Sequence, residues 1–237
     1  LQHRTGNGLV YSSSRLSDDQ AAERLLQRVD GATLAAPRFL RFIPGRREKT
    51  WEKNCVAMGL ASGFIEPLES TSIHLIQAAI TRLTQLFPAK SLSGPDADYD
   101  DLRDKFNHEA KNEIEEVRDF IILHYVATER NDSEFWRSCS ALTLPDSLVN
   151  KINLFRNDGR VRIEHRNIFT EASWLSVLLG QGVYAQGYTP MVNRISTDEL
   201  SQYMAQQKIS MQKVLAGMPT HDEYLMSYLA NENNYKG

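Results

Sequence analysis

The stretch from Tyr99 to Arg130 contains neither glycine nor proline and carries helix-forming residues throughout. Apolar side chains recur in it at intervals of three or four residues, as one face of a helix requires. These side chains are Ile114, Val117, Ile121 and Tyr125. The stretch therefore predicts one long helix, the longest element of the chain.

Shorter elements are expected on both sides of this helix. Ser17 is the expected N-cap of a helix over Asp18–Val29. Basic and apolar residues alternate over Arg38–Ile43, and a buried run follows over Lys53–Leu60, so both are predicted as strands. Further helices are predicted over Ser72–Phe87, Ser133–Ser140, Asp146–Arg156, Ala172–Leu179, Thr197–Ala216 and Thr220–Leu229. The predicted class is α+β and mostly helical.

The segment Gly59–Ser72 joins the second expected strand to the helix that follows it. Its glycines allow the backbone to approach a flat or anionic ligand closely. The unpaired N–H groups at the start of the next helix can hold an anion, and Glu69 lies beside them as a proton acceptor. A carboxylate at a helix start is more often only a partner of the helix dipole, and Thr71-Ser72 only an N-cap pair. Taken alone, the segment leaves both interpretations open.

The residues from Asn54 to Thr71, NCVAMGLASGFIEPLEST, resemble the signature of the flavin-dependent tryptophan halogenase family. The resemblance continues on both sides of this signature and covers most of the chain. It implies the C-terminal part of a flavoprotein monooxygenase-like fold with two dinucleotide-binding motifs. Residues 1–90 would then be the C-terminal portion of the FAD-binding domain, and residues 91–237 a mainly helical lobe on the substrate side.

The resemblance also implies roles for individual residues. Glu69, near a lysine from the family's N-terminal half, would orient the halogenating species or accept the proton lost from the ring, assisted by Ser70. Thr71 and Ser72 would hold chloride or bromide. Many relatives have glycine where this chain has Ser72, and serine does not adopt positive φ freely, so a bromide preference is expected. The flavin would contact Gly59, Ala61, Gly63, Phe64, Ile65 and Pro67.

The expected substrate-binding residues lie in a segment that departs from the family pattern. The enzymes acting on free tryptophan use paired aromatics and a glutamate, whereas this chain has Trp174-Leu175 and Gln181. A neutral glutamine pairs with an ammonium group more weakly than glutamate does. A neutral indole or another electron-rich aromatic is therefore expected, with Trp174 as a stacking wall. The nearby residues 180–185 fit the text pattern GxGxxA, but they follow a helix, so a glycine turn at a helix end is expected instead.

The family's glycine-rich phosphate loop, catalytic lysine and Trp-x-Trp-x-Ile-Pro motif have no counterpart in this sequence. The resemblance thus implies a C-terminal fragment of a halogenase that binds FAD poorly by itself. The complete reaction would use O₂ and reduced FAD from a separate flavin reductase. Two alternatives stay open: a flavin monooxygenase-like relative without halide use, and a non-catalytic helical fragment that binds a partner.

Composition excludes several other classes of protein. The net charge of −3 gives no reason to expect nucleic acid or an anionic membrane as partner. The two cysteines, Cys55 and Cys139, are far apart in sequence, so a disulfide framework is not expected. A reducing cytoplasm is the expected compartment. The histidines lack metal-binding spacings, and His124 is expected to pack in the core with one satisfied ring nitrogen. A homodimer is left open.

Overall fold

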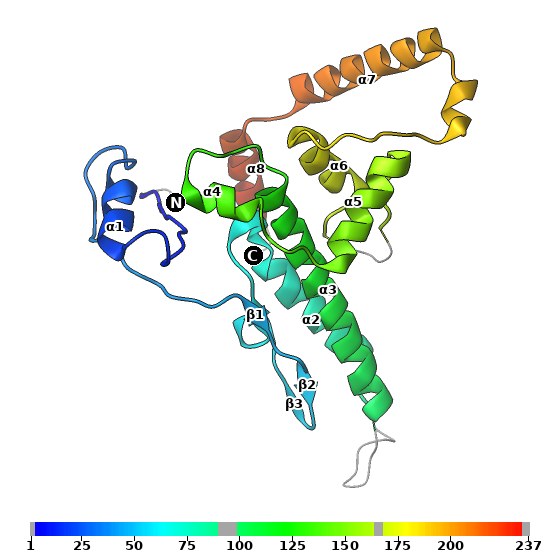
Figure 1. The fold of residues 1–237 in the computed structure, drawn as a ribbon. Coiled ribbons are helices and arrows are strands. Elements are labelled where there is room, and N and C mark those ends of the chain that lie inside the picture. Colours follow the sequence, from blue (N-terminus) through cyan, green and yellow to red (C-terminus); the bar gives the residue numbers. More distant parts are fainter. Residues whose placement is uncertain (1–2, 90–98, 164–167, 234–237) are drawn as a thin grey trace. The chain divides into compact units, whose positions relative to one another are not determined.

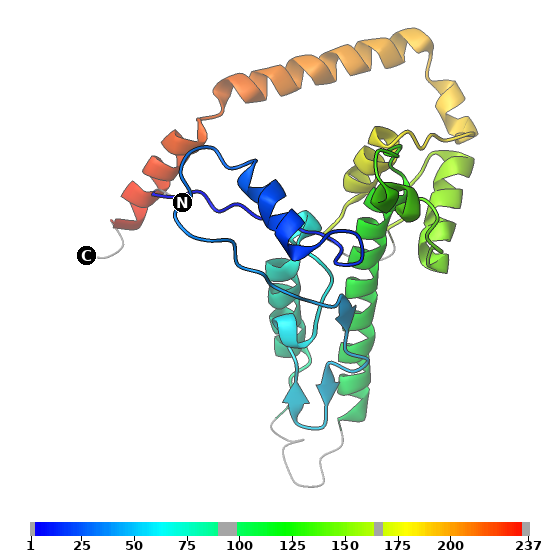
Figure 2. The same ribbon diagram turned by 60° about the vertical axis from the view of Figure 1, so that its left-hand side comes forward.

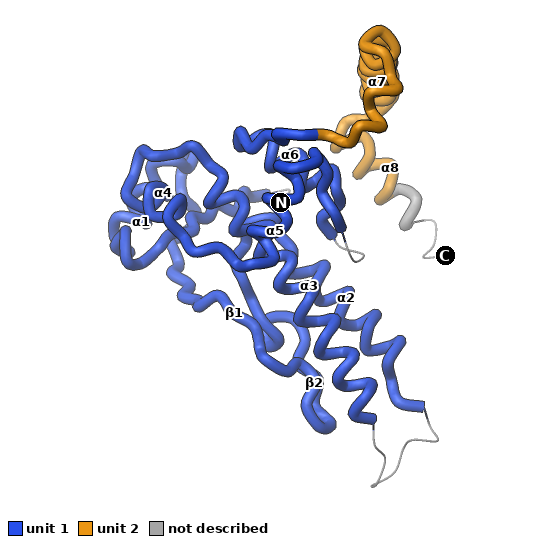
Figure 3. Tube along the Cα trace, turned by 45° about the vertical axis from the view of Figure 1, so that its right-hand side comes forward, with its two compact units in different colours: residues 1–187 blue, residues 188–237 orange. Residues whose placement is uncertain are grey.

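The computed structural model describes residues 3–89, 99–163 and 168–233, and its contacts divide the chain into two compact units. Figure 3 shows the first unit, Leu1–Gly187, and the second, Tyr188–Gly237, in different colours. The functional boundary predicted near residue 90 stays a prediction.

The predicted long helix is α3, Asp100–Val126, with 27 residues. It runs beside α2, Ser72–Gln85, in both ribbon views (Figures 1 and 2). An ion pair and a histidine–carboxylate contact join the two helices: Arg82 Nη2 lies 2.7 Å from Glu113 Oε2, and His74 Nε2 lies 3.2 Å from Glu113 Oε1. Arg82 also lies over the ring of Phe106, 5.5 Å from its centroid. Both helices thus begin and end within a few residues of their predicted bounds.

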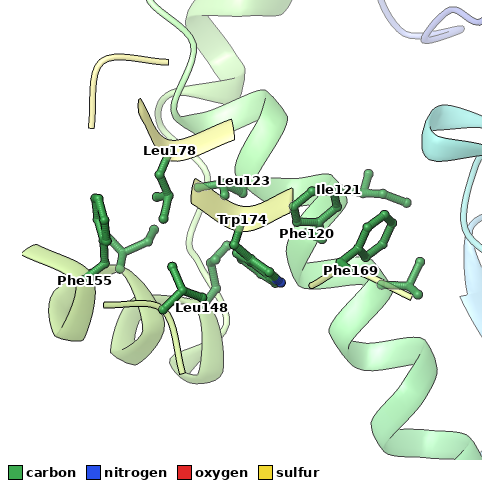
Figure 4. Close-up of a cluster of buried hydrophobic side chains, with 11 residues drawn as sticks. Phe120, Ile121, Leu123, Leu148, Phe155, Phe169, Trp174 and Leu178 are labelled. Atoms are coloured by element: carbon green, nitrogen blue, oxygen red, sulfur yellow. The ribbon is translucent and has the colours of Figure 1, made fainter. Parts of the chain in front are cut away.

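The hydrophobic core lies between α3, α5 (Asp146–Asp158) and α6 (Glu171–Gly180). The rings of Phe120 and Phe169 stack with centroids 3.9 Å apart, and Trp174 meets Phe120 edge to face at 4.9 Å. Figure 4 shows these rings with the aliphatic side chains that surround them. The buried members of the cluster are Val117, Phe120, Ile121, Leu123, Leu148, Ile152, Phe155, Val161, Phe169, Trp174 and Leu178.

The strands are shorter than predicted. The expected strand over 53–60 is wrong: β2 (Trp51–Glu52) turns at Lys53, which has a φ of 53°, and pairs with β3 (Cys55–Val56). β1 (Gly45–Arg46) pairs with β4 (Gly63–Phe64), likewise antiparallel. The strand expected over Arg38–Ile43 is also wrong. That segment has no regular structure, and its Ile43 is 92% exposed.

One side chain of α3 supports the β2–β3 hairpin. Asn107 Oδ1 accepts hydrogen bonds from the backbone N–H groups of Thr50 and Trp51, both at 2.8 Å. Its Nδ2 donates to the carbonyl of Trp51 at 2.8 Å. A short hairpin gains little from its own pairing, so this amide ties the hairpin to the long helix.

The remaining helices of the first unit are short. α1 covers Asp18–Leu26 and has the predicted Ser17 cap, in a capping box with Gln20. α4 covers Glu134–Cys139. Single 3₁₀ turns, η1 (Gly59–Ala61) and η2 (Leu68–Ser70), flank β4. The second unit contains α7 (Thr197–Gly217) and α8 (His221–Asn233), close to the predicted bounds, and η4 (Pro190–Arg194), which was not predicted. Among the described residues, no helix is both long enough and apolar enough to cross a membrane.

Candidate functional site

The loop before α2 holds two consecutive residues in the left-handed region. Glu69 has φ 66° and ψ −2°, and Ser70 has φ 52°. Neither is glycine, so each conformation costs about 1–3 kcal/mol and persists only where the surroundings enforce it. A backbone hydrogen bond of 3.0 Å from Ser70 N–H to the Pro67 carbonyl closes this turn. Strain of this kind is concentrated at functional sites in proteins.

The carboxylate of Glu69 contacts a histidine from the middle of the fold. His124 Nε2 lies 3.0 Å from Glu69 Oε1, and the Glu69 side chain is 34% exposed. The other ring nitrogen, Nδ1, lies 2.8 Å from the Phe120 carbonyl one helical turn earlier. The prediction that His124 has one satisfied nitrogen therefore missed its second partner. No local pattern reveals that partner, since the two residues are far apart in sequence.

A second carboxylate of the same loop is held by the next residue of α3. Tyr125 Oη donates a 2.7 Å hydrogen bond to Glu66 Oε1. Burial, and then this hydrogen bond, raise the pKa of Tyr125 above its ordinary value. The Tyr125 ring stacks on Trp136 with centroids 5.8 Å apart. Sequence reasoning had not singled out Glu66 and Tyr125 as functional residues.

The N-cap residue of α2, Thr71, makes no side-chain hydrogen bond to the first N–H groups of the helix. Thr71 is buried at 3% exposure, and its backbone is right-handed after the left-handed Ser70. Successive residues of opposite hand direct their N–H groups into a concavity that suits an anion. Ser72 lies inside α2 and is not among the positive-φ residues of the described chain. Ser72 thus keeps the ordinary backbone expected of serine, and the expected bromide preference stays a prediction.

Residues 1–197 match the family model described as tryptophan halogenase. The chain belongs to this family. The predicted family is thus confirmed, and we refer below to the chain as a halogenase-family chain.

Three relatives illustrate the match. The flavin-dependent halogenase Xcc4156 from Xanthomonas campestris superposes with a TM-score of 0.84 at 44% identity, over 92% of this chain and 43% of that one. BrvH, a flavin-dependent halogenase from Brevundimonas sp. BAL3, superposes with a TM-score of 0.83 at 41% identity, over the same shares of the two chains. Tryptophan 7-halogenase KtzQ from Kutzneria sp. (strain 744) is 31% identical over 95% of this chain and 44% of its own length. The chain spans less than half the length of these relatives.

The residues predicted to contact flavin in this halogenase-family chain lie in η1, β4 and the turn after it. A Cβ atom on Gly63 would lie 2.8 Å from the Gly45 carbonyl oxygen and 2.9 Å from Ile114 Cδ1. The close approach of β1 and α3 therefore requires glycine at position 63, whether or not flavin binds there. Phe64 meets Phe42 edge to face at 5.0 Å, whereas Ala61 and Pro67 are exposed. The predicted flavin contacts of these residues, and those of Gly59 and Ile65, stay predictions.

The residues predicted to bind substrate are divided between the core and the surface. Trp174 is only 1% exposed, so the described structure gives it a packing role and no free face for stacking. Leu175 is half-buried against the same cluster. Trp174 still connects to the loop, because it touches Phe120, whose ring meets His124 edge to face at 4.9 Å.

Gln181 lies at the other end of α6, in an open pocket with Glu129 and Tyr184. Gly182 follows with φ 77°, and Val183 N–H donates to the Leu178 carbonyl at 2.8 Å. This is the glycine turn at a helix end that the sequence predicts, rather than a phosphate loop.

Metal binding has no support in the described part of the chain, which contains no group of three or more His, Cys, Asp or Glu side chains arranged to hold an ion. His165 lies outside the described residues. The histidine that matters here, His124, is engaged by a carboxylate and a carbonyl.

Proposed function

We propose that this chain carries the substrate-side and halide-side groups of a flavin-dependent halogenase that acts on an electron-rich aromatic such as an indole. The observation that carries the proposal is Glu69, a carboxylate held in a left-handed backbone by His124 and followed by the uncapped start of α2. Family membership supports the same reaction class.

Glu69 is the proposed catalytic residue. When an electrophilic halogen adds to an aromatic carbon, that carbon becomes tetrahedral and carries both the halogen and its original hydrogen. The proton passes to Glu69, whose Oε2 has no hydrogen-bond partner among the described residues, and the C–H bonding electrons restore the aromatic ring. Ser70, next to it, assists through its backbone or hydroxyl.

Thr71 and Ser72 are the proposed halide ligands. They would bind chloride or bromide through the backbone N–H groups at the start of α2, where the helix dipole also favours negative charge. The left-handed Ser70 before Thr71 gives the turn a form that suits an anion.

The flavin would lie against Gly59, Ala61, Gly63, Phe64, Ile65 and Pro67. These residues fit it, because Glu66, the one carboxylate among residues 59–67, is turned to Tyr125 and leaves backbone and apolar groups for the cofactor. Reduced FAD, which we expect a separate reductase to supply in the cytoplasm, would provide the electrons that let O₂ oxidise the halide.

The aromatic substrate would contact the half-buried Leu175 and Gln181. Gln181 is neutral, which favours an uncharged indole over an amino acid. For Trp174, burial supports a role in packing behind Phe120.

The test uses the complete protein encoded by the gene, supplied with reduced FAD, O₂, bromide and indole. Glu69→Gln is expected to lower the rate of bromoindole formation by about 100-fold or more, since positioned general bases contribute about 10²–10⁴-fold. Glu48→Gln, at an exposed carboxylate of the same unit, is the matched control and should leave the rate unchanged.

Product mass separates the alternatives. Oxygenated product, formed with or without bromide, would show a monooxygenase-like relative instead. Full bromination by the Glu69 variant would overturn the role of that residue while leaving the reaction class intact.

A further inference from the structure

Two adjacent residues of α3 hold both carboxylates of the loop that precedes α2. His124 contacts Glu69, and Tyr125 donates to Glu66. Adjacent residues of a helix point in directions about 100° apart, so they reach two different points of the loop. Between these points lies the turn at Pro67 and Leu68, and directly after it the left-handed Glu69 and Ser70.

The contact between His124 and Glu69 requires one shared proton. A carbonyl oxygen only accepts hydrogen bonds, so Nδ1, at 2.8 Å from the Phe120 carbonyl, carries a hydrogen. With Nδ1 occupied, the 3.0 Å contact between Nε2 and Glu69 Oε1 is favourable only when one further proton lies between them. Oε1 is thereby fixed, and Oε2 is left for another partner.

The helix that supplies both residues is firmly held. Phe120, one turn before His124, is packed between Phe169 and Trp174. Asp119, buried at 2% exposure, accepts a hydrogen bond from Ser147 of α5 and another from Arg118 Nε at 2.9 Å. These contacts fix α3 against the core, so its side chains can hold a strained loop in place.

We propose that His124 and Tyr125 form a two-point clamp that keeps Glu69 in its strained conformation with Oε2 free for the reaction. His124 is then a positioning residue for the carboxylate, and Tyr125 a positioning residue for the turn that carries it. The inference rests on the proposed function, in which Glu69 accepts the ring proton.

The kinetic test compares variants of the complete protein with reduced FAD, O₂, bromide and indole. His124→Leu should lower kcat by about 10- to 100-fold with little change in KM for indole, because a displacement of about 1 Å at a reacting group can cost about 100-fold. His124→Gln, whose amide can still donate to Glu69, should recover most of the activity. His108→Leu, at an exposed position of the same helix, is the matched control.

A double-mutant cycle separates positioning from a general structural role. In a Glu69→Gln background, His124→Leu should cause no further loss of kcat, since its effect passes through Glu69. An equal loss in both backgrounds would overturn the proposal, as would a Gln variant no more active than the Leu variant.

A spectroscopic measurement does not depend on halogenation. In nuclear magnetic resonance of the protein labelled with ¹⁵N at histidine, Glu69→Gln should shift the ring-nitrogen signals of His124, and Glu48→Gln should leave them unchanged. Unshifted signals in the Glu69 variant would refute the clamp. If the wild-type protein makes no halogenated product, the proposed function fails, whereas this signal still reports whether the clamp exists.

Discussion

The two units of the chain hold their helices in different ways. In the first unit, α3, α5 and α6 enclose a core in which Val117, Leu123 and Leu148 have no exposed surface. In the second, no described side chain over residues 188–229 is buried, and Met204, Met211 and Leu215 of α7 are all more than 60% exposed. Core packing therefore stabilises one unit, and local hydrogen bonds the other.

The local side-chain hydrogen bonds of the second unit include two capping boxes. Glu199 Oε2 accepts from Ser196 N–H at 2.9 Å, and Ser196 Oγ accepts from Glu199 N–H at 3.2 Å. Thr220 and Glu223 repeat the arrangement at the start of α8. These hydrogen bonds lower the pKa of both glutamates. A strained loop such as the one at Glu69 needs the first kind of support, because caps fix only the turn that contains them.

The largest expected effect comes from the core. Leu148→Ala should lower the free energy of unfolding of the first unit by about 2–5 kcal/mol, as a cavity opens among packed side chains. Urea unfolding followed by tryptophan fluorescence measures it, since all three tryptophans lie in this unit. Leu215→Ala, at 68% exposure in α7, should change stability by no more than about 0.5 kcal/mol. A comparable loss there would show that the second unit has a buried partner and would break the contrast.

An intermediate effect is expected at the clamp. Tyr125→Phe removes the hydrogen bond to Glu66 and should cost about 1.5–3 kcal/mol at neutral pH, as for hydrogen bonds to charged groups. Urea unfolding by fluorescence measures this as well, with Tyr184→Phe, at an exposed position of the same unit, as control.

The same variant gives a pH-dependent result. The folded-state pKa of Tyr125 is raised by burial and by Glu66, so its contribution is complete below the unfolded pKa of about 10 and is lost as pH rises through the folded value. Above about pH 10 the wild type should therefore lose stability that the phenylalanine variant does not lose, and the gap between them should narrow. A gap that is constant or widens would contradict the hydrogen bond as the cause.

The smallest effect is expected at the cap of α7. Ser196→Ala should destabilise the first turn of that helix by about 1 kcal/mol, because the N–H of Glu199 loses its acceptor. Amide hydrogen exchange of α7 measures the change, with Ser201→Ala inside the helix as control. Exchange that is unaffected by the cap would mean that packing, and not capping, holds α7, which would remove the difference between the units.

The sequence predicted the helices well, because their signals are local. The stretch without glycine or proline defined α3, and the expected N-cap Ser17 defined the start of α1. The strand expected over Arg38–Ile43 failed for two reasons. Its basic residues, Arg38 and Arg41, recur after three positions rather than two, so no face of a strand is consistently polar. A strand also needs a neighbour for its backbone N–H and C=O groups, and none pairs with it among the described residues.

The site was predicted in part for the same reason. The signature around Glu69 identified the loop and the family, which needs no knowledge of contacts. Neither the left-handed backbone at Glu69 nor its contact with His124 could be read from the signature, since both arise when α3 meets the loop. Trp174 illustrates the opposite error, in which an aromatic residue expected at a binding surface is needed to fill the core.

Asn107 and His124 lie on the same uninterrupted helix, one tied to the β2–β3 hairpin and the other to Glu69. At about 1.5 Å per residue, the length of α3 separates these two residues by about 26 Å along the helix axis. The number of residues between them also fixes the directions in which their side chains point, since each residue turns the helix by about 100°. A change of length between the two residues alters these directions, whereas a change of side chain leaves them as they are. A single inserted residue would rotate His124 and Tyr125 away from both carboxylates while leaving every residue type in the chain unchanged.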